Sequence, residues 1–454
     1  MTSRYLFGRA CVLGVVSICL SLGALSPARA QTVLNAQQRW HKLCEIRQAK
    51  LDRVLPSAMR ENHIDMWIVA VKEGHDDPMA VMLGEGEPGA QGPNFYIFTD
   101  RGQPRIERAL LGLSAPLLED CPSYDLHVSR KDLRAFVTER HPQRIGVDMS
   151  DELGTADGLS YAEYQYLAKT LGEPYASRLV SAETLISRFR SRHVQGEIDA
   201  YAQAGKLSQV LVERALSNEV ITPGKTTLKE VAWWLAEQQR VLGLGSSFGL
   251  PSVSILGPGP SATSDDHVIE RGALLQIDWG VGYLNEWTDM KRTAYVLKQG
   301  ETAAPPGLQH AFDRGLAIRD VLYKNIKPGI PAAEMLKRLE ALVGAMPGYV
   351  RTDFGKPHTA DPAITEFLIG SHSTGDWGHG SGPWMGPYVQ GLNPMRMAET
   401  LEPSNFNSIE FISYTVVPEW HGVRLSLNLE DDAMITAEGV EWLYPPSDRI
   451  LLTK

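Results

Sequence analysis

The stretch LLQIDWGVGYLNEWTDMKRTAYVL, residues 274–297, reads as two apolar strand segments joined by a turn, and it contains two aspartates. The apolar runs on both sides of GVGYLNE predict an antiparallel hairpin centred near Tyr283–Leu284. Residues opposite each other then have numbers that sum to 567, which places Asp278 across from Asp289 on one face. Like charges at that spacing destabilise a sheet unless one is protonated or a cation lies between them. The hairpin is therefore compatible with a protonated aspartate or with a cation between the two.

A second hairpin repeats this pattern near the C-terminus. FNSIEFISYTVVPEWHGVRLSLNLEDDAMIT, residues 406–436, predicts two strands around the turn PEWHG. Pairing about Trp420 places Glu410 across from Glu430. Glu410 stands in the apolar run IEFISYTVV, where a lone charge is costly. Two independent hairpins that each carry an opposed acidic pair make coincidence a poor explanation.

The segment between the hairpins, SHSTGDWGHGSGPWMGPY, is rich in Gly and His. His379 taken alone has the alternative of an ordinary loop histidine, and Glu410 has that of a buried salt bridge with Arg424 or Lys291. Together, four carboxylates and one imidazole predict an oxygen-rich site for two divalent ions, with Mn²⁺ favoured over Zn²⁺, Co²⁺ and Fe²⁺. Two such ions would hold a bridging hydroxide as nucleophile. The predicted metal ligands are Asp278, Asp289, His379, Glu410 and Glu430.

The first thirty residues predict a secretory signal peptide. Arg4 and Arg9 precede the apolar run CVLGVVSICLSLGAL, and the small-residue motif ARA ends at Ala30. A membrane anchor is the alternative, but the apolar run contains Ser and Gly and is short for a bilayer span. The mature protein is therefore expected to be exported and to reside in the periplasm, with no membrane attachment after cleavage.

Composition argues against two classes of partner. The chain has 44 Lys and Arg against 54 Asp and Glu, for a net charge of −10 at pH 7. A negative balance without a block of Lys or Arg argues against binding to nucleic acid or to an anionic membrane. Cys44 and Cys121 are the cysteines that remain after signal cleavage. In an oxidising compartment they form a disulfide or stay as two buried thiols, and the sequence leaves both open.

The pattern of the sequence changes near residue 182. Residues 31–182 alternate between helical and strand patterns, with DMWIVAV and PNFYIFTD as buried strands, and predict an α/β domain. Residues 183–454 follow with helices and with strands joined by Gly- and Pro-rich connections, and the stretch 181–220 reads as one long helix. The predicted organisation is a signal peptide, residues 1–30, followed by two domains.

These motifs resemble the M24 or "pita-bread" metallopeptidases, which include methionine aminopeptidase, Xaa-Pro aminopeptidase, prolidase and creatinase. The shared pattern is D-x-G, then D-x-x-R-T, a Gly-His-Gly segment, a Glu in an apolar strand and a Glu-Asp-Asp near the C-terminus. The resemblance covers residues 185–454, and the region before it resembles a creatinase/prolidase-type N-terminal domain. It implies an α/β (α+β) fold in which a pita-bread catalytic domain of antiparallel sheets and flanking helices follows that domain.

The resemblance also implies a role for each ligand. Asp278 would bind one ion, His379 and Glu410 would hold the other, and Asp289 and Glu430 would bridge the two. In such enzymes the glutamate at the position of Glu410 also exchanges protons with the attacking hydroxide. Substrates in the peptidase branch are short peptides with proline after the scissile bond, and relatives are commonly homodimers.

The chain departs from the peptidase pattern at three positions. The peptidases carry a second His after the ligand His, and that position is Gly386 here. They carry another His before the first Asp, at a position that falls near Ser261. Their Arg before the last Glu is replaced by Asn428. Loss of a donor that stabilises the tetrahedral intermediate costs about 10²–10³ in rate. We expect His372 or His267 to act as a substitute catalytic donor, because both lie in the segments concerned.

Three functions are compatible with these residues. The leading one is an exported, dinuclear-metal-dependent hydrolase of the Xaa-Pro peptidase type that cleaves short peptides. The second is a relative acting on a non-peptide small molecule, as a C–N hydrolase or a metal-dependent lyase, and an unusually small, closed pocket would favour it. The third is a non-catalytic binding protein on the same fold. The complete set of five ligands argues against a metal-free enzyme and against the binding protein.

Overall fold

The computed structural model of the chain describes residues 33–84, 92–113, 121–259, 262–356, 358–377, 379–386 and 394–454. The predicted signal peptide, residues 1–30, lies outside these ranges, and so does Ser261. Residues Leu34 to Lys454 form one unit, and the predicted division of this unit into two domains at residue 182 stays a prediction.

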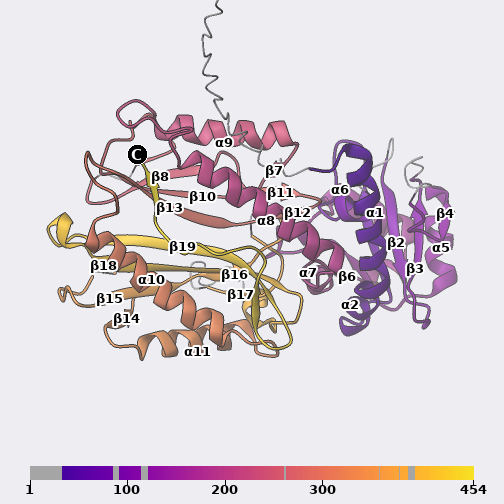
Figure 1. Cartoon of the computed structure of the whole chain (residues 1–454). Helices are drawn as coiled ribbons and strands as arrows, with labels where there is room; N and C mark the ends of the chain where they lie inside the picture. The colour runs from indigo at the N-terminus through magenta and orange to yellow at the C-terminus, as the bar shows by residue number, and fades with distance from the viewer. Residues whose placement is uncertain are drawn as a thin grey trace, which may run out of the picture. The chain divides into compact units, whose positions relative to one another are not determined.

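Six strands form the first sheet, in the order β4-β3-β2-β1-β5-β6 (Figure 1). The runs MWIVAV of β1 and NFYIFT of β2 are buried along their whole length, as continuous apolar strands require. β2 pairs antiparallel with β3. The strands are β1 (Met66–Val71), β2 (Asn94–Thr99), β3 (Glu107–Leu111), β4 (Leu126–Val128), β5 (Ile145–Val147) and β6 (Leu179–Ser181). The helices of this part are α1 (Ala36–Arg53), α2 (Leu55–Glu61), α3 (Ala80–Gly84), η1 (Arg130–Asp132), α5 (Leu133–Arg140), η2 (Gly154–Ala156), α6 (Tyr161–Leu171) and η3 (Ala176–Arg178).

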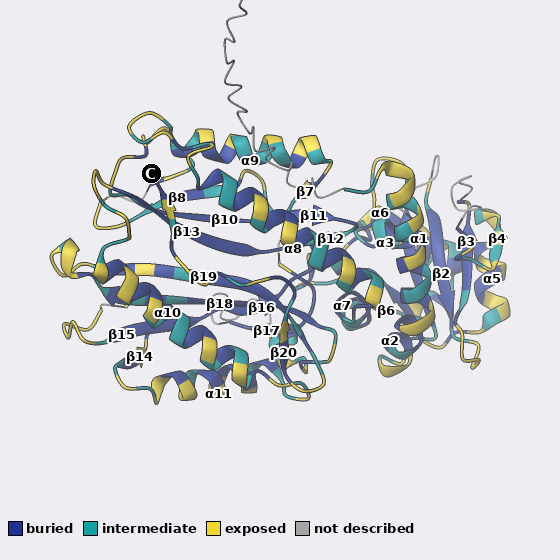
Figure 2. Ribbon diagram, viewed as in Figure 1, coloured by how far each residue is buried: buried dark blue, intermediate teal, exposed yellow. Residues whose placement is uncertain are grey.

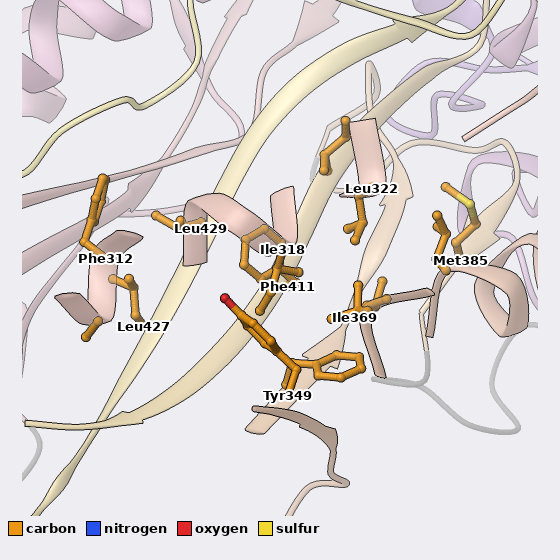
Figure 3. Close-up of a cluster of buried hydrophobic side chains, with 14 of the residues drawn as sticks. Phe312, Ile318, Leu322, Tyr349, Ile369, Met385, Phe411, Leu427 and Leu429 are labelled. Carbon is orange, nitrogen blue, oxygen red and sulfur yellow. The ribbon is translucent and has the colours of Figure 1, made fainter. Parts of the chain in front are cut away.

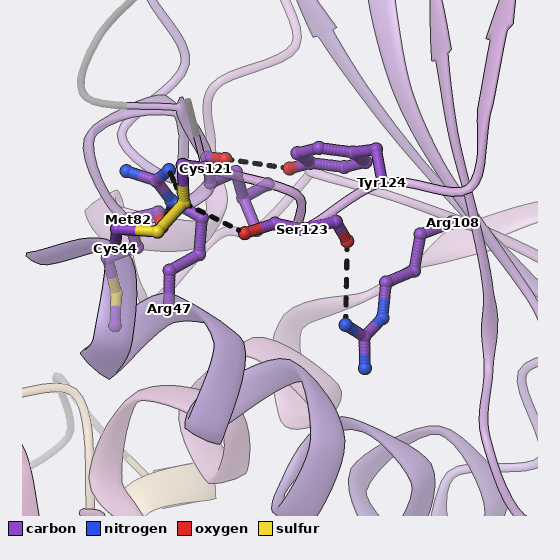
Figure 4. Close-up of a disulfide and its surroundings, with 8 residues drawn as sticks. Cys44, Arg47, Met82, Arg108, Cys121, Ser123 and Tyr124 are labelled. Atoms are coloured by element: carbon purple, nitrogen blue, oxygen red, sulfur yellow. Dashed lines mark hydrogen bonds between the residues drawn. A yellow bond between two sulfur atoms is a disulfide. The ribbon is translucent and has the colours of Figure 1, made fainter. Parts of the chain in front are cut away.

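A disulfide joins α1 to the segment between β3 and β4 (Figure 4). The Cα atoms of Cys44 and Cys121 are 5.8 Å apart, within the range that the bond requires. Cys121 Sγ lies 3.2 Å from Ser123 Oγ, and the Tyr124 hydroxyl donates to the Leu83 carbonyl at 2.7 Å. Of the two alternatives that the sequence leaves open, the structure has the disulfide.

Replacing both cysteines by serine is expected to lower the free energy of unfolding by about 2–4 kcal/mol. The bond spans a sequence separation of 77 residues, and a crosslink across a long loop removes much conformational entropy from the unfolded chain. Urea unfolding of the oxidised protein and of the Cys44→Ser/Cys121→Ser variant measures the difference. The wild type in dithiothreitol should match the variant, and equal midpoints under all conditions would contradict the prediction.

The helical stretch predicted over 181–220 is two helices, so the prediction of one continuous helix is wrong. The first ends at Ser191 and the second begins at Gln195. At the start of the second helix, the Glu197 side chain accepts a hydrogen bond from the Val194 N–H at 2.8 Å. This bond satisfies one of the free N–H groups that every helix start exposes, and so stabilises a break that apolar periodicity does not reveal.

Two further main sheets lie in the rest of the described chain (Figure 1). One has the order β21-β13-β10-β8-β9. The other runs β14-β15-β18-β16-β17 and continues from β18 through β19 to β20, and a short sheet, β12-β11-β7, accompanies them. α9 packs against β8, α8 against β11 and β12, and α10 against β18 and β19. The helices are α7 (Glu183–Ser191), α8 (Gln195–Ala215), α9 (Leu228–Leu242), α10 (Pro306–Asn325), α11 (Ala332–Gly344), α12 (Pro394–Ala398) and η4 (Pro418–Trp420).

The strands of the first of these sheets and of the short sheet are β7 (Gly245–Ser246), β8 (Ser252–Leu256), β9 (Ala262–Thr263), β10 (Leu274–Trp279), β11 (Val281–Tyr283), β12 (Glu286–Trp287), β13 (Met290–Val296) and β21 (Leu451–Thr453). Those of the other sheet are β14 (Tyr349–Arg351), β15 (Thr365–Ile369), β16 (Ser371–Ser373), β17 (Trp384–Met385), β18 (Phe406–Val416), β19 (Arg424–Ile435) and β20 (Val440–Trp442). In the described residues, no helix combines the length and the apolar character that a bilayer span requires.

Side chains alternate between two faces along β18 and β19, so that the apolar core lies on one face and the polar site on the other. Phe411 on β18 and Leu429 on β19 belong to a buried cluster that includes Phe312 of α10, as Figure 3 shows. Burial of each such side chain contributes roughly 1.5–3 kcal/mol. Successive side chains of a strand point to opposite faces, so Glu410 and Glu430 point away from this core. Figure 2 shows that these strands are largely buried while the outer faces of the helices are exposed.

Candidate metal centre

The hairpin at residues 274–297 folds in a register different from the predicted one. β10 pairs with β13 so that Asp278 lies opposite Lys291 and not opposite Asp289. The turn consists of Leu284 and Asn285, whose φ values are 54° and 62°, as a two-residue hairpin turn requires. The predicted partner was wrong by two residues because Asn285, which tolerates positive φ, forms the turn. A shift by two keeps the same side chains on the same face.

The register predicted for the second hairpin is confirmed. β18 and β19 pair along their length with Glu410 opposite Glu430. Both glutamates are buried, with exposed fractions of 7% and 1%. The turn contains the short helix η4, and Trp420 lies at its end. Two opposed and largely buried carboxylates therefore occupy the polar face of this sheet.

Six described residues contribute ligand atoms to one cluster between the two sheets. The structure brings together all five predicted ligands and adds one histidine, His372. Within each of three overlapping groups, the ligand atoms lie within 4.8 Å of one another. The groups are Asp278, Asp289 and Glu430; His372, Glu410 and Glu430; and Asp289, His372 and His379.

The ammonium group of Lys291 lies inside this cluster. Its Nζ is 3.1 Å from Asp278 Oδ2 and 3.0 Å from Glu410 Oε1, and it also donates to Glu430 Oε2. Of the two alternative salt-bridge partners considered for Glu410, the structure selects Lys291, whereas Arg424 donates to main-chain carbonyls. Sequence reasoning named Lys291 only as that alternative. Its position two residues after Asp289, and so on the same strand face, is the signal that could have identified it.

Burial and charge shift the pKa values of this cluster in opposite directions. Burial acts against the charge of Lys291, but Asp278, Glu410 and Glu430 outweigh it and raise the pKa of Lys291. Burial, together with the charges of Glu430 and Asp278, raises the pKa of Asp289 well above its usual range. The pKa of Glu430 is lowered, because Lys291 and a neighbouring imidazole outweigh the effect of burial. Asp289 is thus the carboxylate that most needs an additional cation in order to ionise.

Asp289 also has the contacts expected of a metal ligand. Its buried Oδ1 has no hydrogen-bond partner among the described residues, and an isolated buried carboxylate is costly. Imidazole nitrogens of His372 and His379 lie within 4.8 Å. Asp432, which sequence reasoning did not single out, accepts from the Asp289 N–H at 2.9 Å and holds the backbone in place. A carboxylate with two imidazoles suits Zn²⁺, Fe²⁺ or Mn²⁺, so these residues fit a divalent ion.

The loop that carries His379 is attached to α7 by a buried ion pair. Arg190 Nε donates to Asp376 Oδ1 at 2.7 Å, and both side chains are nearly inaccessible. Asp376 Oδ2 in turn accepts from the Ser381 N–H at 2.8 Å. These bonds lie on both sides of His379 in the chain. They hold the loop that presents the imidazole to the cluster.

Trp384 occupies the space beside the two histidines. The centroid of its ring is 5.3 Å from that of His372 and 5.1 Å from that of His379. A Cβ at position 386 would lie 2.8 Å from Trp384 Nε1 and 3.2 Å from the Gly370 backbone. A histidine in place of Gly386 would therefore require Trp384 to move, which gives a physical reason for this departure from the peptidase pattern.

The structure brings His372 to the metal centre but not His267. His372 is buried, and its Nε2 lies 3.2 Å from Glu430 Oε1 and 3.4 Å from Glu410 Oε2. His267 has a largely exposed side chain whose Nδ1 lies 2.9 Å from Asp265 Oδ1, and it is not among the described residues that line the adjoining cavity. A catalytic role for His267 therefore has no geometric support, and that of His372 stays a prediction.

A cavity of about 1020 Å³ adjoins the cluster. Of the four cluster carboxylates, only Glu410 is among its described lining residues. Trp377 and Trp384 both line it. The described lining residues are Pro78, Val81, Glu152, Leu153, Gly154, Thr155, Arg190, Trp287, Phe354, His372, Trp377, His379, Trp384, Arg396, Glu410, Ile412 and Asn428.

A buried guanidinium group faces this cavity. Arg396 is 5% exposed, its Nε donates to the Gly382 carbonyl at 2.9 Å, and its Cζ lies 4.6 Å from the centre of the Trp384 ring. Burial lowers its pKa to about 10. Among the described residues, no acidic side chain forms an ion pair with it. Because buried charges are normally paired, Arg396 favours a ligand that carries a negative charge.

The model of metallopeptidase family M24 matches residues 199–437, more than half of the 454 residues of the chain. The chain belongs to metallopeptidase family M24. The matched segment of this M24 protein contains every residue of the ligand cluster, which confirms the resemblance inferred from the motifs. A search of curated protein sequences finds no match to it.

Solved structures share the fold of this M24 protein. X-Pro aminopeptidase from Thermotoga maritima superposes with a TM-score of 0.62 at 16% identity, and the match covers 87% of this chain and 99% of that one. Xaa-Pro dipeptidase from Bacillus anthracis superposes with a TM-score of 0.58 at 17% identity, and the match covers 92% of this chain and 100% of that one. Prolidase from Pyrococcus horikoshii superposes with a TM-score of 0.55 at 17% identity, and the match covers 90% of this chain and 99% of that one. The predicted α/β fold of the pita-bread type is confirmed.

Proposed function

We propose that this M24 protein is a metal-dependent hydrolase of the Xaa-Pro peptidase type that acts on short peptides. The observation that carries the proposal is the convergence of Asp289, His372 and His379 with the buried glutamates beside the cavity. A divalent ion held there supplies a Lewis acid for the scissile carbonyl. Mn²⁺ stays the first candidate, ahead of Zn²⁺, Co²⁺ and Fe²⁺.

Glu410 is the residue best placed to move a proton in such a reaction. It lines the cavity, and its Oε1 accepts hydrogen bonds from Lys291 at 3.0 Å and from Asn428 Nδ2 at 2.8 Å. Its pKa is lowered, because Lys291 and His372 outweigh the effects of burial and of the adjacent Glu430. The carboxylate is therefore ionised at neutral pH, as a general base requires.

The cavity supports a short peptide with a free carboxyl terminus as the substrate. Its volume of about 1020 Å³ is at the upper end of the range for small-molecule sites, and does not match the small, closed pocket expected of an enzyme for a compact metabolite. Arg396 offers a buried positive charge for the terminal carboxylate, and Trp384 offers an apolar ring surface for a proline.

We also propose that the protein is exported to the periplasm and forms a homodimer. The disulfide between Cys44 and Cys121 supports an oxidising compartment. Dimerisation follows only from the family resemblance, and size-exclusion chromatography with light scattering measures it directly.

The proposed function is tested with a panel of peptides and metals. The purified protein is freed of metal, supplied separately with Mn²⁺, Zn²⁺, Co²⁺ or Fe²⁺, and assayed on Gly-Pro and on Xaa-Pro-Xaa peptides with free or amidated carboxyl termini. We expect turnover only with metal, better turnover of the free acids because of Arg396, and no turnover by Asp289→Ala. A folded, metal-loaded protein that hydrolyses none of these peptides would contradict the proposal and favour the small-molecule alternative.

A further inference from the structure

The contacts of the Lys291 ammonium group are those of a bound cation. It touches one oxygen from each of three carboxylates, those of Asp278, Glu410 and Glu430. An ammonium group has three N–H donors, so all three are directed to charged acceptors. The three acceptors come from both hairpins and therefore from both of the facing sheets. A residue of the chain thus joins the two acidic pairs that the sequence led us to assign to two metal ions.

Lys291 is held in this position by the fold. Its backbone pairs with that of Asp278 in the interior of the β10–β13 ladder, and its side chain is 9% exposed. The three carboxylate contacts hold the ammonium group inside the cluster. Withdrawal of Lys291 to admit another ion would also leave it without its three partners, which is costly for a buried charge.

The cluster residues that Lys291 does not contact form one of the three overlapping groups. Asp289, His372 and His379 each offer one ligand atom, and these atoms lie within 4.8 Å of one another. The buried Oδ1 of Asp289 has no hydrogen-bond partner among the described residues. This group has the ligands for one divalent ion, and none of them is an acceptor of Lys291 in the described contacts.

Formal charge permits this division. The four carboxylates carry four negative charges, which Lys291 and one divalent ion balance to within one unit. A second divalent ion would leave an excess of one positive charge in place of one negative charge, so the division rests on the contacts of Lys291 and not on the charge count.

We propose that Lys291 takes the place of one of the two metal ions, so that this chain binds a single divalent ion through Asp289, His372 and His379. The proposal rests on the proposed function in taking the cluster to be a metal centre. It revises the predicted pair of ions to one ion and one built-in cation. His372, expected to replace a lost substrate donor, becomes a metal ligand.

The number of bound ions tests the proposal. Wild-type protein and the variants Lys291→Ala and Lys324→Ala are equilibrated with Mn²⁺ or Zn²⁺, freed of loosely bound metal, and analysed by elemental analysis and by native mass spectrometry. We expect one ion for the wild type and for Lys324→Ala, whose lysine has an exposed side chain on α10. We expect two for Lys291→Ala, because its truncated side chain frees both the charge and the space. Two ions in the wild type, or one in Lys291→Ala, would overturn the proposal.

Thermal unfolding gives a second readout that does not depend on activity. Without metal, Lys291→Ala is expected to unfold at a lower temperature than the wild type, because its carboxylates repel one another. Excess Mn²⁺ should raise the midpoint of the variant more than that of the wild type. If Lys291→Ala does not fold, Lys291→Met takes its place in this comparison, and the wild-type ion count decides by itself.

The same counts separate this proposal from the proposed function. One ion in the wild type without peptide turnover would contradict the peptidase function and support the role of Lys291. Two ions in the wild type with peptide turnover would support the peptidase function and contradict the role of Lys291. No ion in the wild type would contradict both the single ion proposed here and a metal-dependent function.

Discussion

Changing Glu410 to glutamine is expected to lower kcat about 10²–10⁴-fold, the range for loss of a general acid–base catalyst. The amide keeps the volume of the side chain, and its oxygen can still accept from Lys291 and from Asn428, as Glu410 Oε1 does at 3.0 and 2.8 Å. What is lost is the ionised oxygen near His372 Nε2, on the only cluster carboxylate among the described cavity residues. Steady-state kinetics on the best peptide of the panel measures the effect.

Two companion measurements show whether this loss arises from proton transfer. Glu441→Gln, at an exposed position on β20, should leave kcat unchanged. The metal content of Glu410→Gln should equal that of the wild type, because the ion is assigned to Asp289, His372 and His379. Retention of wild-type kcat by Glu410→Gln would remove Glu410 from the reaction, and a loss of metal would assign it a ligand role.

Changing Arg190 to methionine is expected to lower the free energy of unfolding by about 3–5 kcal/mol, the effect of breaking a buried ion pair on one side. Methionine fills a similar volume but leaves the Asp376 carboxylate buried with only its bonds to Ser381. The loop that carries His379 then loses its attachment to α7. Urea unfolding at neutral pH measures the change, and a reduced affinity for metal should accompany it.

A matched variant on the same helix makes this result specific. Arg188 also pairs with an acidic residue, Glu61, but its side chain is 33% exposed, so Arg188→Met should cost only about 0–1 kcal/mol. The double variant Arg190→Met/Asp376→Leu should regain most of the stability, because an apolar pair can replace a buried ion pair. Equal effects of Arg188→Met and Arg190→Met would contradict the role assigned to the pair.

The pH dependence of stability should change in the same variant. Burial opposes ionisation of Asp376, but Arg190 outweighs it and lowers the pKa of Asp376 below the usual value of 3.8. The unfolded chain therefore takes up this proton at a higher pH than the folded one. The contribution of the pair is complete above about pH 4 and is lost as the pH falls through the lower, folded-state pKa. Arg190→Met should lose this part of its acid dependence.

The two hairpins show how accurately a sequence pattern predicts strand register. The partners of Glu410 and Glu430 were predicted correctly, because two long strands flank a single turn and fix its centre. The first hairpin was misplaced by two residues, because its turn is formed by Leu284 and Asn285, both at positive φ, and not by Tyr283 and Leu284. The sheet face on which each aspartate lies was still predicted correctly, because side chains alternate between the two faces with a period of two residues.

The sequence alone determined the family, five of the six residues of the cluster and the face of the sheet on which each carboxylate lies, because these depend on residue types at fixed spacings and on local periodicity. Tertiary structure decided the rest. It placed the Lys291 ammonium among three carboxylates, divided the stretch at 181–220 into two helices, joined Cys44 to Cys121 and left Arg396 facing the cavity. Each of these results depends on the position in space of a flexible side chain or of a segment distant in the sequence. Neither residue spacing nor periodicity along the chain specifies that position.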